Sequence, residues 1–250
     1  MSTLAIGIDI GGTGIKGALV DVDAGELVSE RFKVPTPEGG EPDAIIAEVV
    51  KMLEGMGPKA DGVPVGVCFP AIILNGRTMS AANVSKKWVG LDAEAAFERA
   101  LHRDITFIND ADAAAVAEAR YGAAKGKSGL VILTTLGTGI GSGLLYNGVL
   151  IPNAELGHLV VSGKDAEKRA SYSAKEREGL DWKQWARRLQ KYYETLDFLF
   201  SPDLIIVGGG VSKSYEEFLP LLKLRPPIVP AALRNNAGIL GAAAMAVHAR

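Results

Sequence analysis

Two glycine-rich segments of this 250-residue chain have the composition of phosphate-binding turns. Asp9–Gly14 and Gly137–Gly139 each lie between two apolar, strand-like runs. Glycine lets backbone N–H groups approach a ligand closely, and the hydroxyls of Thr13 and Thr138 can donate to phosphate oxygens. We therefore expect a hairpin at each segment that wraps a chain of phosphates. The residues expected to bind phosphate are Gly11, Gly12, Thr13, Gly14, Lys16, Gly137, Thr138 and Gly139.

Asp9 stands at the mouth of the first turn, where a carboxylate would repel bound phosphates unless a cation bridged them. Mg²⁺ commonly joins carboxylates to phosphates, and it keeps several of its waters. Asp9 therefore indicates a magnesium ion, held through water. The alternative is a pair of ordinary tight hairpins, in which Asp9 is only a turn-forming residue.

Three polar residues, Asn109, Asp110 and Asp112, stand where a predicted strand meets a predicted helix. Asp112 fits the first turn of a helix, where the dipole favours negative charge, and Asp110 fits an N-cap. An acid at this place can also accept a proton from a substrate hydroxyl. A second polar pair, Glu155 and His158, has hydrogen-bonding groups suited to a polyol, although His158 also fits an ordinary half-buried histidine.

A third glycine cluster, which consists of Gly208, Gly209 and Gly210, follows a strand-like run and is a candidate contact for the adenosine of a nucleotide. Two other nucleotide motifs are rejected. The segment Gly12–Gly17 matches the dinucleotide fingerprint formally, but a strand is predicted where the fingerprint needs a helix. The segment Gly122–Ser128 is one residue too short for a P-loop and precedes a strand instead of following one.

Three groups of basic residues lie in predicted loops and would suit a long polyanion such as inorganic polyphosphate better than ATP. The alternative is that they are ordinary solvated surface side chains. The residues are Lys86, Lys87, Lys125, Lys127, Lys164, Lys168 and Arg169.

The elements that must position these residues form a repeated pattern. Gly12-Thr13-Gly14-Ile15 recurs 125 residues later as Gly137-Thr138-Gly139-Ile140, which suggests two related lobes with a cleft between their turns. Strands are predicted at 4–8, 15–20, 27–34, 63–69, 105–108, 130–136, 140–146 and 204–207. Helices are predicted at 43–56, 93–101, 109–119, 182–200 and 237–249, and the polar segment 75–90 is predicted to be a binding loop. The helix 182–200 has an apolar stripe of Trp185, Leu189, Tyr192, Leu196 and Leu199.

Composition excludes several classes of protein. The net charge of −2 provides no general attraction for nucleic acid. Cys68 is the only cysteine, so an intramolecular disulfide and a zinc site made of several cysteines are excluded. The N-terminus lacks the features of a signal peptide, and no apolar run reaches the roughly 18 residues of a membrane span. We therefore expect a cytoplasmic protein.

Five segments occur in the order found in the ROK family of bacterial sugar kinases and repressors, and together they extend over nearly the whole chain. They are Asp9–Lys16, Asn109–Ala111, Leu136–Gly141, Glu155–His158 and Gly208–Ser212. The chain resembles this family. Ser85–Trp88 and Gly163–Glu167 resemble its branch of actinobacterial polyphosphate/ATP-dependent glucokinases (glucomannokinases).

The resemblance implies an α/β protein with the actin-like ATPase (ribonuclease H-like) fold, in two lobes around a central cleft. The expected lobes are residues 1–108 with 237–250, and residues 109–236. The implied activity is phosphorylation of glucose, and of mannose, at the 6-hydroxyl, with polyphosphate or ATP as donor and Asp110 as general base. The alternatives are a strictly ATP-dependent kinase for another hexose and a non-catalytic sugar-binding relative.

The resemblance also implies the ligands of the sugar, which are Asn83, Asn109, Asp110, Glu155, His158 and Glu167. Many members carry a cysteine-rich zinc loop after the Glu-x-Gly-His motif, whereas residues 161–178 here contain no cysteine, so no zinc is expected. Without that landmark, Glu167 is chosen by spacing and Glu176 is the alternative. The expected partners are a hexose and the phosphate donor, without nucleic acid or membrane, and a homodimer is left open. A repressor and an actin-like filament or chaperone ATPase are less suited to this set of residues.

Overall fold

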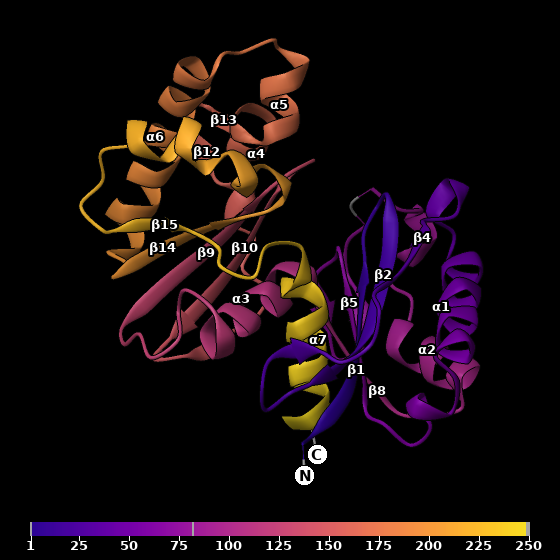
Figure 1. The fold of residues 1–250 in the computed structure, drawn as a ribbon. Coiled ribbons are helices and arrows are strands. Elements are labelled where there is room, and N and C mark those ends of the chain that lie inside the picture. The colour runs from indigo at the N-terminus through magenta and orange to yellow at the C-terminus, as the bar shows by residue number, and fades with distance from the viewer. Residues whose placement is uncertain (1, 82, 249–250) are drawn as a thin grey trace. The chain divides into compact units, whose positions relative to one another are not determined.

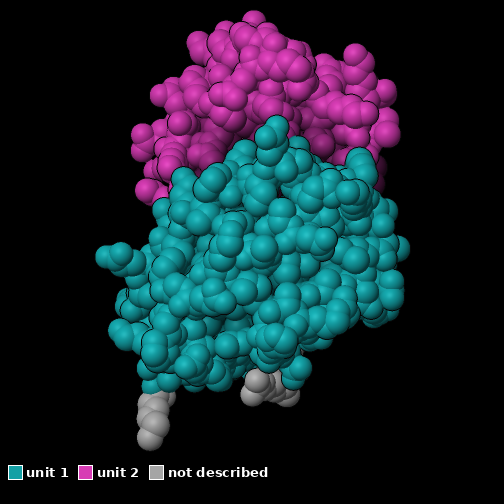
Figure 2. All heavy atoms as spheres, turned by 90° about the vertical axis from the view of Figure 1, so that its right-hand side faces the viewer, with its two compact units in different colours: residues 1–117, 236–250 teal, residues 118–235 magenta. Residues whose placement is uncertain are grey.

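The computed structural model describes residues 2–81 and 83–248, so residue 249 of the predicted last helix lies outside it. The chain forms two compact units, the first with residues 1–117 and 236–250 and the second with residues 118–235 (Figure 2). The division falls within α3 (Asp110–Tyr121). Each unit has one main β-sheet with helices packed against it (Figure 1).

The sheet of the first unit has the order β3-β2-β1-β5-β8, and β4 pairs with β2. Its strands β1, β5 and β8 are parallel, whereas β2 runs antiparallel to β1. The strands are β1 (Leu4–Ile10), β2 (Gly14–Asp21), β3 (Glu26–Leu27), β4 (Phe32–Pro35), β5 (Val65–Phe69) and β8 (Ile105–Asn109). The helices besides α3 are α1 (Pro42–Met56), α2 (Ala93–Leu101) and α7 (Ala237–His248). Because the parallel strands end at the same edge, the segments after β1, β5 and β8 are brought together there.

The alternating sequence of β1 determines which helices cover each face of this sheet. Ile6 and Ile8 lie in the hydrophobic core that includes α1 and α2. Gly7, the residue between them, faces α7, which lies on the other side of the sheet (Figure 1). A Cβ atom at Gly7 would stand 1.9 Å from the carbonyl oxygen of Ile239, so α7 can pack this closely only against glycine. The same alternation directs Asp9 toward the N-terminal end of α7, where Gly238 lies.

The sheet of the second unit has the order β11-β10-β9-β14-β15. Its strands are β9 (Leu130–Leu136), β10 (Ile140–Tyr146), β11 (Val149–Ile151), β14 (Leu204–Gly208) and β15 (Ile228–Pro230). Here too an antiparallel pair joined by a glycine turn, β9 and β10, is followed by parallel strands, β14 and β15. The predicted strand–turn–strand unit is therefore confirmed in both halves of the chain.

The helix α6 (Trp182–Phe200) buries its apolar stripe in the core of the second unit. A capping box starts this helix: the Asp181 side chain accepts from the Gln184 N–H, and the Gln184 side chain accepts from the Asp181 N–H. The stripe residues from Trp185 to Leu196 are buried as predicted. The prediction is wrong for Leu199, which is 53% exposed, because the next residue, Phe200, packs against the core at this end of α6 instead.

Two other predictions differ from the structure. The predicted strand 27–34 is divided into β3 and β4, because the hydroxyl of Ser29, between them, accepts the Leu19 N–H at 3.0 Å in place of a backbone carbonyl. The predicted loop 75–90 contains part of the small hairpin of β6 (Ile73–Leu74) and β7 (Arg77–Thr78), and the 3₁₀ turn η3 (Lys86–Trp88). In residues 2–81 and 83–248, no helix is both long enough and apolar enough to cross a membrane.

Candidate active site

The first glycine turn connects β1 to β2 at the edge where β1, β5 and β8 end. The Gly11 N–H donates to the Gly14 carbonyl oxygen at 3.0 Å, and the Thr36 hydroxyl donates to the Gly11 carbonyl oxygen at 2.5 Å. A strand follows the glycines, as predicted, so the dinucleotide-binding interpretation is excluded.

Asp9 is held from three directions beside this turn. Its Oδ2 accepts from the Lys16 ammonium at 2.9 Å, because the two residues are directly opposite each other on β1 and β2. Its Oδ1 lies 3.7 Å from the Cys68 thiol on the neighbouring strand β5. A Cβ atom at Gly238 would stand 2.9 Å from the Asp9 carboxyl carbon, so Asp9 also lies against the first turn of α7, where a negative charge is favourable. The Asp9 carboxylate therefore contacts β2, β5 and α7, and the interpretation of Asp9 as only a turn-forming residue does not account for these contacts.

Asn83 lies against the same turn. Its backbone is in the left-handed region, with φ of 61°. A Cβ atom at Gly12 would stand 2.7 Å from the Cβ of Asn83. The first unit therefore brings one predicted sugar ligand next to one predicted phosphate-binding residue.

The start of α3 shows which residue caps this helix. The Oδ1 atom of Asn109 accepts from the N–H groups of Ala111 at 2.8 Å and Asp112 at 3.0 Å, which is the pattern of an N-cap. The Nδ2 group of Asn109 donates to the Ala71 carbonyl oxygen at 3.0 Å. Asp110 is the first residue of the helix, and its Oδ1 accepts from the Ala111 N–H at 2.8 Å. The capping interpretation of Asp110 is therefore wrong, because Asn109 makes the cap.

The second glycine turn, between β9 and β10, is fastened by a residue that the sequence did not single out. The Gly137 N–H donates to the Gly139 carbonyl oxygen at 3.0 Å. Ser173, in α5 (Tyr172–Arg177), donates its N–H to the Gly137 carbonyl oxygen at 3.0 Å and its hydroxyl to the Thr138 carbonyl oxygen at 2.6 Å. The turn thus depends on a segment that begins about 30 residues later in the chain.

Glu155 precedes, and His158 ends, a 3₁₀ turn, η4 (Leu156–His158), that packs on β10. A Cβ atom at Gly157 would stand 2.1 Å from the carbonyl oxygen of Ile140, the first residue of β10. The Ser142 hydroxyl of β10 accepts the Leu156 N–H at 2.8 Å. These contacts place the predicted sugar ligands of this segment next to the second glycine turn.

Glu167 reaches the same turn from α4 (Ala166–Ala170). Its Oε2 accepts the Ile140 N–H at 2.9 Å, and a Cβ atom at Gly139 would stand 2.2 Å from that oxygen. The alternative, Glu176, lies in α5, where its carboxylate interacts with Tyr172. The structure therefore joins Glu167, and not Glu176, to the second turn.

The electrostatics of this group depend on Asp165, a second residue that the sequence did not single out. The Nδ1 atom of His158 lies 3.1 Å from Oδ2 of Asp165, and its Nε2 lies 3.9 Å from Oε2 of Glu155. The hydrogen bond to Asp165, reinforced by the charges of Glu167 and Glu155, raises the pKa of His158 above its usual value despite partial burial. Burial raises the pKa of Glu155, against the opposing effect of His158. Asp165 also accepts the Lys168 N–H as the N-cap of α4, the only role its position in the sequence indicates.

The third glycine cluster lies beside the second turn. Gly208 ends β14 and pairs with Thr135 of β9, and a Cβ atom at Gly209 would stand 2.4 Å from the carbonyl oxygen of Leu136. Gly210 begins the 3₁₀ segment η5 (Gly210–Glu217). Two glycine clusters of the second unit thus meet at the carboxyl ends of parallel strands, a usual position for ligand binding in α/β sheets.

The predicted basic groups differ in their surroundings. The Lys87 ammonium forms an ion pair with Glu41 at 2.9 Å, and the Lys86 ammonium donates to the Ala81 carbonyl oxygen at 3.2 Å. Lys125 and Lys127 are exposed on a turn after α3. Lys164, Lys168 and Arg169 lie in β13 (Lys164–Asp165) and α4 of the second unit.

The residues around the first turn fit a magnesium ion. In residues 2–81 and 83–248, no three acidic, histidine or cysteine residues are grouped to enclose a metal. Mg²⁺ does not need such a group, because it commonly takes one or two carboxylates and fills its other positions with waters and substrate phosphates. The Asp9 side chain is 18% exposed beside a glycine turn, so it can serve as that carboxylate through water.

The arrangement agrees with comparisons to known proteins. The model of the ROK family matches residues 5–178, so the chain belongs to the ROK family. It is 45% identical to the polyphosphate glucokinase of Mycobacterium tuberculosis over 242 residues, which cover 96% of this chain and 90% of that protein.

Two solved structures are similar to this chain over nearly its whole length. The inorganic polyphosphate/ATP-glucomannokinase of Arthrobacter sp. strain KM is 52% identical, with a TM-score of 0.95 over 99% of this chain and all of that one. A ROK family glucokinase from Streptomyces griseus, in complex with glucose and AMPPNP, is 26% identical, with a TM-score of 0.84 over 98% of this chain and 99% of that one. The predicted family and the α/β, actin-like ATPase fold are therefore confirmed.

Proposed function

We propose that this chain phosphorylates glucose, and also mannose, at the 6-hydroxyl, with inorganic polyphosphate or ATP as phosphoryl donor. The observation that carries the proposal is the likeness over almost the whole chain to the Arthrobacter polyphosphate/ATP-glucomannokinase, with a TM-score of 0.95 and 52% identity. The Mycobacterium tuberculosis polyphosphate glucokinase, 45% identical, supports the same reaction and the same donor.

Asp110 is the proposed general base. As the sugar oxygen attacks the terminal phosphorus, its proton passes to the Asp110 carboxylate, and the bond from phosphorus to the remaining phosphate chain breaks. The capping of α3 by Asn109 supports this role, because the cap orients the first residue of the helix. Phosphoryl transfer needs chiefly positioning and charge neutralisation, which a rigid helix start provides.

The proposed sugar ligands fall into two sets. Asn83, Asn109 and Asp110 belong to the first unit, and Glu155, His158 and Glu167 belong to the second. The Oδ1 atom of Asn109 accepts from the Ala111 N–H, and one hydrogen of its side-chain amide donates to the Ala71 carbonyl oxygen. Asn109 would therefore bind the hexose through the other hydrogen of this amide. The bond from the Ile140 N–H to Glu167 supports choosing this residue over Glu176.

The proposed donor site uses the glycine clusters. The turns Gly11–Gly14 and Gly137–Gly139 bind phosphates, with Thr13, Thr138 and Lys16 as additional donors. Gly208–Gly210 contacts the adenosine when ATP is the donor, which the position of Gly209 against Leu136 supports. Asp9 would hold Mg²⁺ through water, and a bound ion would neutralise charge on the phosphate oxygens.

The experiment offers the purified protein glucose, mannose and other hexoses, with ATP or polyphosphate, and measures sugar phosphate. We expect glucose 6-phosphate from both donors and mannose 6-phosphate at a lower rate. Turnover with ATP and a different hexose only would instead establish a strictly ATP-dependent hexokinase. Sugar binding without transfer from either donor would establish a non-catalytic relative. Location in the cytoplasm and assembly as a homodimer stay predictions.

A further inference from the structure

A short segment of the first unit, residues 36–41, lies against residues 83–88, which begin with the proposed sugar ligand Asn83. The Ser85 N–H donates to the Gly40 carbonyl oxygen at 3.2 Å. A Cβ atom at Gly40 would stand 3.0 Å from a backbone atom of this neighbour, so the two backbones are in close contact. We name residues 36–41 the strap and residues 83–88 the Asn83 segment.

Trp88 joins the strap to the core of the first unit. Its Nε1–H donates to the Gly40 carbonyl oxygen at 2.8 Å. Its side chain is fully buried, and its ring centroid lies 4.4 Å from that of Phe69 and 6.1 Å from that of Phe97. A buried indole N–H needs an acceptor, and the surrounding rings fix its direction. The Gly40 carbonyl is therefore held where the Trp88 ring presents its N–H.

Glu41 fastens the strap to the Asn83 segment a second time. Its Oε1 accepts from the Ser85 hydroxyl at 3.0 Å, and its Oε2 pairs with the Lys87 ammonium at 2.9 Å. The side chain of Lys87 is 74% exposed and that of Glu41 is 42% exposed, so this pair contributes less than the buried bond from Trp88. Lys87 thus has an acidic partner within the fold, which a side chain reserved for polyphosphate would not need.

The other end of the strap is bonded to the first glycine turn. The Thr36 hydroxyl donates to the Gly11 carbonyl oxygen at 2.5 Å, and the Thr36 N–H donates to the Thr13 carbonyl oxygen at 3.4 Å. A Cβ atom at Gly12 would in turn stand 2.7 Å from the Cβ of Asn83. The turn, the strap and the Asn83 segment therefore form a closed ring of contacts within the first unit.

The position of Asn83 depends on this ring. Asn83 is exposed, so packing in the core does not orient its side chain. Its φ of 61° lies in the left-handed region, which asparagine tolerates better than most residues but which neighbouring contacts must maintain. The two residues that follow it, Val84 and Ser85, contact the strap. Bonds to the strap therefore restrain the direction in which the Asn83 side chain points.

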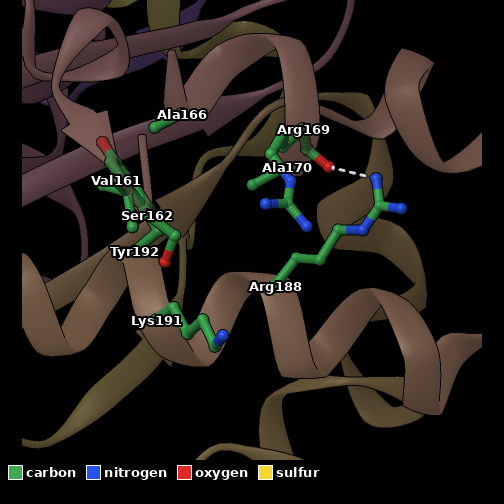
Figure 3. Close-up of a pocket in the computed structure, with 8 residues that line it drawn as sticks. All are labelled: Val161, Ser162, Ala166, Arg169, Ala170, Arg188, Lys191 and Tyr192. Atoms are coloured by element: carbon green, nitrogen blue, oxygen red, sulfur yellow. Dashed lines mark hydrogen bonds between the residues drawn. The ribbon is translucent and has the colours of Figure 1, made fainter. Parts of the chain in front are cut away.

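The second unit holds the helix that carries Glu167 by bonds of the same kind. The Arg188 guanidinium donates to the Arg169 carbonyl oxygen at 3.0 Å (Figure 3). The Nε1–H of Trp185, which is also fully buried, donates to the Ala170 carbonyl oxygen at 3.0 Å. Both donors belong to α6 and both acceptors to α4. In each unit, a buried indole N–H therefore bonds to a backbone carbonyl of a segment that carries or contacts a proposed sugar ligand.

We propose that the strap positions Asn83 for the sugar, and that Trp88 and Glu41 are the positioning residues through which it acts. The inference rests on the proposed function, because it takes Asn83 as a sugar ligand. A binding group that is misplaced by about 1 Å loses much of its contribution. Loss of the strap bonds should therefore weaken sugar binding without removing any group that touches the sugar. Lys87 belongs to this arrangement instead of to a track for polyphosphate.

The first test compares Trp88→Phe with Val49→Ala. Trp88→Phe removes the buried N–H and keeps an aromatic ring, whereas Val49→Ala weakens the same core and leaves the bonds of the strap in place. With either donor, Trp88→Phe should raise the KM for glucose about tenfold and change kcat less than about threefold. Val49→Ala should change this KM less than about twofold. A rise of equal size in both variants would show that Trp88 acts only through stability, and would overturn the proposal.

The second test asks whether Trp88 acts through Asn83. In an Asn83→Ala background, Trp88→Phe should raise the KM for glucose less than about twofold, because the group that it positions is already absent. The same tenfold rise in both backgrounds would refute the positioning role.

The third test uses Glu41→Ala and Lys87→Gln, which leave the core unchanged. Each should raise the KM for glucose about two- to threefold, by the same factor with ATP and with long-chain polyphosphate. The matched control is Glu48→Ala, which breaks the exposed pair of Glu48 and Lys51 on α1 and should leave the KM unchanged. An unchanged KM in Glu41→Ala would count against the strap. A rise confined to the KM for polyphosphate in Lys87→Gln would return Lys87 to a polyphosphate track.

Calorimetry of glucose binding needs no phosphoryl transfer, so it separates this inference from the proposed function. If the wild-type chain binds glucose but transfers no phosphate, the proposed function fails. Weaker glucose binding by Trp88→Phe than by Val49→Ala would then still support the strap, and equal binding would refute it. Normal transfer by the wild-type chain with an unchanged KM in Trp88→Phe would refute the strap alone, and a wild-type chain that binds no glucose would refute both.

Discussion

The two glycine turns have the same position in their sheets but are stabilised differently. The first contains four residues between the paired residues Ile10 and Ile15, and the second contains three between Leu136 and Ile140. The charged pair beside the first turn, Asp9 and Lys16, comes from the two strands that the turn connects. The strands of the second turn carry Thr135 and Gly141 at the positions that correspond to Asp9 and Lys16.

The second turn instead depends on the segment 155–178, through Glu167 and Ser173. Its part 161–178 is the stretch in which the resemblance to the ROK family implied a cysteine-rich zinc loop, and it contains no cysteine. Here hydrogen bonds to the turn come from α4 and α5, two short helices without cysteine. The first unit therefore combines its glycine turn with the proposed base, whereas the second combines its turn with Glu155, His158 and Glu167, proposed sugar ligands that take no part in the proton transfer. Substitution of the base should lower kcat, and substitution of these three ligands should raise KM.

The largest effect is expected at the start of α3 in the first unit. Asp110→Asn should lower kcat about 10²- to 10⁴-fold, because the proton of the sugar hydroxyl loses its acceptor. Asn109→Ala should lower the free energy of unfolding by about 1 kcal/mol, because it removes the cap, and Asp110→Asn should lower it less. Steady-state kinetics and urea unfolding measure the two effects. Near-normal turnover of a folded Asp110→Asn protein would refute the base.

The second prediction concerns sugar binding by Glu167 of the second unit. Glu167→Gln should raise the KM for glucose about 10- to 100-fold, with a smaller change in kcat, because a charged hydrogen bond to the sugar becomes a neutral one. Glu176→Gln is the matched control and should change the KM less than about twofold. A larger rise in the KM for glucose in Glu176→Gln than in Glu167→Gln would identify Glu176 as the sugar ligand.

The third prediction concerns the fastening of the second turn. Ser173→Ala should raise the KM for ATP and for polyphosphate by a similar factor of about 2 to 10, because the hydroxyl that holds the Thr138 carbonyl is lost. Ser173→Thr keeps a hydroxyl and should recover part of the loss. A change confined to polyphosphate would contradict this role, since both donors are proposed to use the turn.

The fourth prediction compares two glycines within one turn. Gly139→Ala should lower the free energy of unfolding by about 1 kcal/mol, because the new methyl group displaces the Glu167 carboxylate from the Ile140 N–H. Gly137→Ala is the control, because a Cβ atom at Gly137 has no neighbour within 4 Å. Thermal unfolding measures both. Equal destabilisation would show that Glu167 does not hold the turn.

The smallest expected effect is on the titration of His158. Asp165→Asn should lower the pKa of His158 toward its usual value, because the hydrogen bond to a charged partner is lost. A raised pKa means that protonated His158 stabilises the fold below the usual histidine pKa of about 6.5, and that this contribution disappears as the pH rises through the folded-state value. NMR titration of the His158 ring in both proteins measures the shift. An unchanged His158 curve would show that Asp165 does not hold the ring.

Much of the fold could be predicted because its signals are local. The limits of 93–101, 130–136, 140–146 and 182–200 follow from periodicity and breakers, and the structure has these elements at the same residues. The strand 27–34 was predicted as continuous, because no local signal shows that the Ser29 side chain replaces a ladder carbonyl. The exposure of Leu199 was missed for a similar reason, since periodicity does not show that Phe200, and not Leu199, packs against the core at the end of α6.

The sequence by itself determined the order of the candidate site residues: two glycine turns, the acids Asp9, Asp110 and Glu155, and a repeat across the halves. Those features are local, because glycine, threonine and aspartate act through the backbone beside them. The tertiary structure decided which of several similar side chains caps α3 and which ones form hydrogen bonds to the second turn. Asn109 became the cap of α3, Glu167 the acid joined to the second turn, and Ser173 its fastening. Each of these roles depends on hydrogen bonds whose geometry is set by folding, and for Glu167 and Ser173 the partners lie some 30 residues away, where no local pattern can indicate them.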